Sequence, residues 1–269
     1  MTPGFDRVLS FEKVANFRDF GYWRAADGAR VAVGRLFRSG HLHSATDTDL
    51  ARMEALGIVS VTDLRHPGEQ RAQPSRWIGK LPLKLIEEPA AERSTSVGSR
   101  AEPPHIKALR ANAQDLASMQ EFMATNYVEM PFDVRLVTLF RRYFETLASG
   151  NGVMLIHCAA GKDRTGILAW LTHRALGVHR DDALEDFLLS NATGDATERL
   201  RQGRRYMEKV HGISASDEVL GSLLSVEPDY LERCEASLIA HSGSVDGYLA
   251  DVLAVNQARR DRIRASLLV

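Results

Sequence analysis

The chain has 269 residues, of which 44% are hydrophobic and 26% are charged, proportions that are ordinary for a globular enzyme. Its 34 Lys and Arg residues nearly balance its 35 Asp and Glu residues, so the net charge of −1 gives no overall attraction to nucleic acid or to an acidic membrane. No apolar run is long enough to predict a membrane span, and the first residues lack the apolar core of a signal peptide.

Strand and helix signals alternate in the first half of the chain. A turn around Asp27-Gly28 precedes the first expected strand, and the β-branched run from Ile58 to Leu64 predicts a buried strand. The expected strands lie at residues 36–38, 58–64 and 83–86, with helices at 46–56 and briefly within 66–80. Residues 88–114 lack clean periodicity and carry paired prolines, which favours an irregular insertion.

The second half of the chain is predicted to be mostly helical. Helices are expected at about 115–130 and 133–148, separated at Pro131, and the turn at 150–152 leads into an apolar strand, Val153 to Ile156. Further helices are expected at 167–176, 181–189, 195–210, 216–223, 228–241, 245–250 and 256–266. We therefore expect one α/β domain over residues 1–269, in which a central sheet is flanked by helices and 180–250 forms a helical extension.

The most informative segment of the sequence runs from His157 to Gly166 and reads His-Cys-Ala-Ala-Gly-Lys-Asp-Arg-Thr-Gly. It follows the apolar strand and opens a helix. Backbone N–H groups converge at such a strand-loop-helix turn, and the helix N-terminus adds partial positive charge, so the loop should cradle an anion. A cysteine in that cradle is favoured as a thiolate nucleophile, and an arginine fork can grip two phosphate oxygens. The segment predicts a cysteine-dependent phosphatase.

A Walker phosphate loop is a competing interpretation, because Gly161-Lys162 resembles its core. That motif requires Gly-x4-Gly-Lys followed by Ser or Thr. Ile156 occupies the first glycine position and Asp163 the hydroxyl position, so the motif does not match.

The His157–Gly166 segment resembles the signature loop of the protein tyrosine phosphatase superfamily, and its Ala-Gly-Lys-Asp-Arg core resembles the atypical bacterial branch. Residues 16–21 (Asn-Phe-Arg-Asp-Phe-Gly) and 34–39 (Gly-Arg-Leu-Phe-Arg-Ser) resemble the N-terminal signature of that branch, and Asp63-Leu64-Arg65 with Glu69 its next strand end. The resemblance covers most of the chain. It implies a protein tyrosine phosphatase-like sheet, with a helical lid over the pocket.

Cys158 is expected to attack phosphorus and form a phosphocysteine intermediate that water hydrolyses. Arg164 is expected to bind the equatorial phosphate oxygens. A lysine could not fill this role, because it cannot form the same two-pronged contact. The phosphate-binding loop is expected to comprise Ala159, Ala160, Gly161, Lys162, Asp163 and Arg164. The supporting residues are expected to be His157, Thr165 and Arg65, with Thr165 either bonding the thiolate or only capping the helix.

The leaving group also needs a proton, and the Trp-Pro-Asp signature of many superfamily members is absent, because no tryptophan precedes a proline. Asp163 is the best candidate for the general acid, a role that the resemblance supports. Asp163 could instead bond Lys162 or the loop amides. Glu87 and Glu88 are alternative acids, although solvated surface charges are the favoured interpretation of both.

Lys162 adds a cation beside Arg164, which favours substrates with extra negative charge and suggests phosphoinositides alongside phosphoproteins. Lys162 could instead be an exposed lysine that only adds to the local field. Secondary candidates for the pocket rim are Arg18, Arg38, Arg65 and His66, with Asp19 and Glu69 orienting those arginines, although all six residues could instead form structural ion pairs. The basic stretch at 199–209 is more consistent with a solvated helix face than with a site for anionic head groups.

The leading hypothesis is a phosphatase that acts on phosphotyrosine, with phosphoserine, phosphothreonine and phosphoinositides as further candidates. A silent phosphate-binding module would not need Cys158, and a rhodanese-like sulfur transferase would not need Arg164. No metal or cofactor is expected, because the histidines show no ligand spacing. A structural Cys234 and a catalytic Cys158 both favour a reducing cytoplasm, since a permanent disulfide would block the nucleophile.

Overall fold

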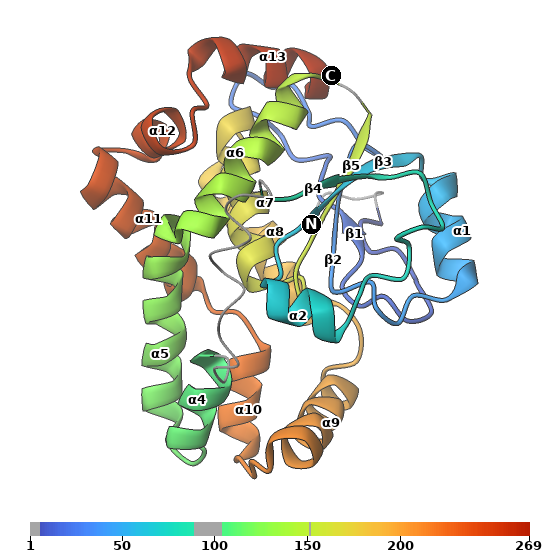
Figure 1. The fold of residues 1–269 in the computed structure, drawn as a ribbon. Helices are drawn as coiled ribbons and strands as arrows, with labels where there is room; N and C mark the ends of the chain where they lie inside the picture. The colour runs from blue at the N-terminus through green and yellow to red at the C-terminus, as the bar shows by residue number, and fades with distance from the viewer. Residues whose placement is uncertain (1–5, 89–103, 151) are drawn as a thin grey trace.

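The computed structural model describes residues 6–88, 104–150 and 152–269, and within them the core is an α/β sheet covered by helices (Figure 1). The strands are β1 (Arg18–Asp19), β2 (Leu36–Ser39), β3 (Ile58–Asp63), β4 (Lys84–Ile86) and β5 (Val153–His157). Their order in the sheet is β1-β2-β5-β3-β4, with β1 antiparallel to β2 and all other neighbours parallel. The expected fold class is confirmed.

Several helices precede β5 in the chain. They are α1 (Asp47–Ala55), α2 (Pro67–Ala72), α4 (Pro104–Ala111), α5 (Leu116–Glu129), the 3-10 turn η1 (Met130–Phe132) and α6 (Val134–Ala148). In Figure 1, α1 lies on one side of the sheet and α6 on the other. Capping explains where several begin, since Thr46, Asp115 and Asp133 each accept a hydrogen bond from the first turn of the following helix.

The chain after β5 is almost wholly helical, as expected. Its elements are α7 (Asp163–Leu176), α8 (Arg180–Ala192), α9 (Ala196–Tyr206), η2 (Met207–His211), α10 (Asp217–Leu224), α11 (Pro228–Ser242), α12 (Val245–Gly247), η3 (Tyr248–Val252) and α13 (Gln257–Leu267). None of the described helices is both long and apolar enough to cross a membrane.

The alternating side chains of β5 fill the two faces of the sheet. Leu155 packs into the cluster that includes Phe37, Met53 and Val61, on the α1 side. Its neighbour Ile156 packs into the larger cluster, which includes residues of α5, α6 and α7. The short apolar run of the sequence therefore forms a central strand that is buried on both faces.

The prediction of an irregular insertion over residues 88–114 is wrong in part. Residues 104–111 form α4, which begins at Pro104 and buries Ile106 and Leu109. Proline suits the first turn of a helix because its missing N–H would have no partner there, and the two apolar residues are one turn apart. Residues 89–103 of the insertion lie outside the described residues.

Candidate active site

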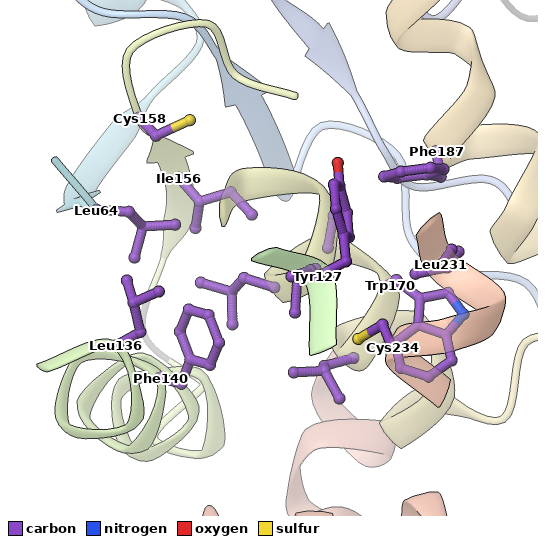
Figure 2. Close-up of a cluster of buried hydrophobic side chains, with 14 of the residues drawn as sticks. Leu64, Tyr127, Leu136, Phe140, Ile156, Cys158, Trp170, Phe187, Leu231 and Cys234 are labelled. Carbon is purple, nitrogen blue, oxygen red and sulfur yellow. The ribbon is translucent and has the colours of Figure 1, made fainter. Parts of the chain in front are cut away.

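The loop from Cys158 to Lys162 lies at the carboxyl edge of the sheet, between β5 and α7. Figure 2 shows Cys158 at the tip of the β5 arrow. The parallel register aligns His157 with both Ser39 of β2 and Asp63 of β3. The segments that follow these three strands therefore leave the sheet together, which is where ligands bind in open α/β sheets.

Gly161 closes the loop over the sulfur of Cys158. Its N–H donates to Cys158 Sγ at 3.3 Å. Gly161 has a φ of 71°, and a Cβ there would lie 2.3 Å from the carbonyl oxygen of Ser39. Only glycine satisfies both the left-handed backbone and this close approach to β2.

Donors outside the loop hold its carbonyl oxygens. Asn16 Nδ2 donates to the Gly161 oxygen at 2.9 Å, and the His41 N–H donates to the Ala159 oxygen at 2.9 Å. Arg38 Nη2 adds a bond of 3.0 Å to the Gly161 oxygen. These bonds satisfy the Ala159 and Gly161 carbonyl oxygens from outside the loop.

The expected rim arginines are not on the rim. Arg18 and Arg38 are completely buried behind the loop, where both pair with Asp186 of α8. Burial, reinforced by the neighbouring Arg38, lowers the pKa of Arg18 to about 9. The Asp19 carboxylate accepts from the N–H groups of Gly21 and Gly34.

Arg65 is also buried, beneath the strand ends. Its guanidinium bonds the Asp63 carboxylate at 2.7 Å and Ser75 Oγ at 2.9 Å. His157 Nε2 lies 3.6 Å from the same Asp63 carboxylate, and burial lowers the pKa of His157 although Asp63 opposes the shift. Asp63 therefore ties two of the predicted supporting residues, Arg65 and His157, together below Cys158.

Arg164 projects from the first turn of α7 to a carboxylate on α2. Its Nη1 and Nη2 atoms bond the two oxygens of Glu69 at 2.6 and 3.0 Å, and Nη1 also bonds the Leu64 carbonyl oxygen at 3.2 Å. Burial alone would lower the pKa of Arg164, but Cys158 and Glu69 outweigh it and raise the pKa. The guanidinium is thus a permanently charged fork with a fixed orientation.

Asp163 is bonded by two donors at a single oxygen. Lys162 Nζ and the Tyr127 hydroxyl each donate to Asp163 Oδ1 at 2.7 Å. Lys162 also donates to the carbonyl oxygen of Ser225, directly after α10, at 3.0 Å. Lys162 is largely buried rather than exposed, and it connects the loop to the helical C-terminal part.

Other sequence expectations have mixed outcomes. Thr165 is buried, and its hydroxyl has no hydrogen-bond partner among the described residues, so the expected bond to the sulfur is not formed. Glu88 is also buried, and its carboxylate pairs with Arg135 of α6, so its interpretation as a solvated surface charge is wrong. Cys234 is buried in the large hydrophobic cluster, away from the loop (Figure 2).

Three residues of the site were not predicted from the sequence. They are Tyr127, which bonds Asp163, Asn16, which bonds the Gly161 carbonyl oxygen, and Asp186, which pairs with Arg18 and Arg38. Tyr127 lies within a helix whose sequence carries no motif, and Asp186 lies 148 residues from the Arg38 that it binds. Only Asn16 had a local signal, since it opens the Asn-Phe-Arg-Asp motif. Within the described residues, no group of three or more His, Cys, Asp or Glu residues could hold a metal ion.

The sequence profile of the tyrosine phosphatase family matches residues 9–269, which includes the loop and nearly every element described above. The chain belongs to the tyrosine phosphatase family. The resemblance to the atypical bacterial protein tyrosine phosphatases, first indicated by the loop, is thereby confirmed.

Two curated members of the family are similar along nearly their whole length. A Cupriavidus necator protein, provisionally named as a tyrosine-protein phosphatase, is 35% identical over 251 residues, or 93% of this chain and 86% of that protein. The triple specificity protein phosphatase PtpB of Mycobacterium tuberculosis is 30% identical over 273 residues, covering 92% and 97% of the two chains. This tyrosine phosphatase family member thus aligns with both relatives over more than nine tenths of its length.

Proposed function

We propose that this protein hydrolyses phosphotyrosine through a phosphocysteine intermediate on Cys158. The observation that carries the proposal is the pairing of a cysteine sulfur that accepts the Gly161 N–H with an Arg164 fork fixed by Glu69. Family membership and the names of the two relatives support it. A silent binding module would need no such nucleophile, and sulfur transfer would need no such fork.

In the first step, the Cys158 thiolate attacks phosphorus and the bond from phosphorus to the phenolic oxygen breaks. Arg164 binds two of the equatorial oxygens, whose charge it stabilises in the transition state. The electron pair of the broken bond goes to the leaving oxygen, which takes a proton from Asp163. In the second step, water attacks the phosphocysteine, Asp163 takes a proton from that water, and phosphate and thiolate are released.

A cysteine-to-serine exchange tests the nucleophile. We expect Cys158→Ser to lower kcat/KM for p-nitrophenyl phosphate by at least about a thousandfold, because a serine hydroxyl is not ionised in this loop. Cys234→Ala is the matched control and should stay within about twofold of wild type, since Cys234 only fills the hydrophobic cluster. Equal rates for Cys158→Ser and wild type would overturn the mechanism.

The proposal extends to more highly charged substrates, phosphoinositides among them, because Lys162 places a second cation beside Arg164. Both cysteines are free thiols, which fits a reducing cytoplasm. The name of the mycobacterial relative, a triple specificity phosphatase, favours a substrate range wider than phosphotyrosine.

A substrate panel tests the role of Lys162. We expect Lys162→Ala to lose about tenfold more kcat/KM on a soluble phosphoinositide than on a phosphotyrosine peptide, because only the former carries further phosphate charge. Lys209→Ala is the control, since Lys209 is exposed on η2 at the end of the basic stretch 199–209. It should change kcat/KM for both substrates by less than about twofold. Equal losses of Lys162→Ala on the two substrates would reject the selectivity.

A further inference from the structure

Tyr127 is a residue of the hydrophobic core whose polar end reaches the candidate active site. The side chain comes from α5 and is completely buried, among residues that include Phe187, Leu231 and Cys234. Its hydroxyl nevertheless donates to Asp163 Oδ1 at 2.7 Å. Figure 2 shows the hydroxyl pointing out of the cluster, toward the part of the view where Cys158 lies.

Two aromatic neighbours fix the ring. Tyr230 of α11 stacks on Tyr127 with centroids 5.3 Å apart and planes 27° apart, and Phe187 of α8 meets it edge-on at 5.8 Å and 87°. Burial raises the pKa of Tyr127 well above its usual range, and the Asp163 charge adds to the rise. The phenol is therefore a neutral donor whose ring is held in place by its aromatic neighbours.

The Asp163 carboxylate is bonded asymmetrically. Within the described residues, both of its side-chain donors, Tyr127 and Lys162, bond Oδ1. Oδ2 is then the oxygen left to transfer a proton, and the two bonds at Oδ1 limit how the carboxylate can rotate. The two donors differ in charge. A phosphate dianion attracts the Lys162 cation, but it does not attract the neutral Tyr127 hydroxyl in the same way.

We propose that Tyr127 is a positioning residue for the acid step: it holds Oδ1 of Asp163 while substrate is bound, so that Oδ2 meets the leaving-group oxygen. This inference rests on the proposed function, with Asp163 as the acid. Lys162 divides its hydrogen bonds between Asp163 and the Ser225 carbonyl oxygen, and a bound phosphate competes for the same ammonium group, so Tyr127 keeps the carboxylate in place. The residue contacts no substrate itself and acts only through Asp163.

The test compares leaving groups, because a misplaced acid harms only those that need a proton. We expect Tyr127→Phe to lower kcat/KM about tenfold for phenyl phosphate, a poor leaving group, and less than about twofold for p-nitrophenyl phosphate, a good one. Tyr230→Phe is the matched control, since it belongs to the same aromatic stack but its hydroxyl lies 3.4 Å from Ser222 Oγ, not at Asp163. It should change neither rate more than about twofold.

A double variant separates positioning from packing. If Tyr127 acts through Asp163, adding Tyr127→Phe to Asp163→Asn should cause no further loss on phenyl phosphate. Tungstate binding by Tyr127→Phe should equal that of wild type, which shows that the loop is intact. The inference is overturned by equal losses on both substrates, by the full tenfold loss in the Asp163→Asn background, or by loss of tungstate binding. An inactive wild type, or an active Cys158→Ser, would instead refute the proposed function.

Discussion

Cys158 and Arg164 lie six residues apart in the chain, yet different parts of the molecule prepare them. The sulfur depends on a local contact, the Gly161 N–H at 3.3 Å. The guanidinium depends on a distant one, because Glu69 lies 95 residues away and orients both of its terminal nitrogens. A motif that looks self-contained in sequence is therefore completed by residues that the motif does not include.

The acid can be tested by its effect on the pH–rate profile. We expect Asp163→Asn to lower kcat/KM for phenyl phosphate by about a hundredfold and to remove the basic limb of the profile, because an amide has no proton to lose at high pH. The measurement is kcat/KM across the pH range for both enzymes. An unchanged profile would move the acid elsewhere, and Glu87→Gln and Glu88→Gln would be tested next.

At the scale of elements, local sequence signals predicted the longer segments well. The β-branched run of β3 and the break at Pro131 between α5 and α6 are local features, and the structure confirms the elements they predict. β1 was missed because its two residues, Arg18 and Asp19, are charged and still buried. Their burial requires partners such as Asp186 that local propensity cannot supply.

In the candidate site too, some residues could be predicted from local sequence and others depend on distant partners. Cys158, Arg164, Lys162 and Asp163 follow from the loop motif alone, since their neighbours in sequence fix the backbone that presents them. Tyr127 could not be predicted, because it enters the site only when α5 packs against α8 and α11. The expected rim positions of Arg18 and Arg38 were wrong for the same reason: the sequence does not show that Asp186 of α8 binds them behind the loop.

At the scale of the whole molecule, the ion pair between Glu69 and Arg164 joins α2 to α7. Burial opposes ionisation of Glu69, but the hydrogen bond and charge of Arg164 outweigh it and lower the pKa of Glu69 to about 2. A carboxyl whose folded-state pKa is depressed contributes its stability above the unfolded value, about 4.5, and loses it as the pH falls toward 2. The native state should therefore weaken over that acidic window.

Urea unfolding at a series of pH values measures this contribution. We expect the free energy of unfolding of wild type to exceed that of Glu69→Gln by about 2 kcal/mol at pH 6 and to converge with it as the pH approaches 2. Glu54→Gln, at an exposed position on α1, is the control and should track wild type throughout. A constant difference between wild type and Glu69→Gln would show that the glutamate stabilises the fold without its charge.

The bonds that shape the loop span very long stretches of chain. Asn16 reaches Gly161 across 145 residues, Arg38 reaches Asp186 across 148, and Arg18 reaches Ser190 across 172. Contacts this distant form late, because the entropy of closing such loops is lost before they contribute any stability. In newly synthesised chains the loop around Cys158 should thus lack these contacts until α8 docks. Recovered turnover would then mark completed folding better than any spectroscopic signal from β5 and α7 alone.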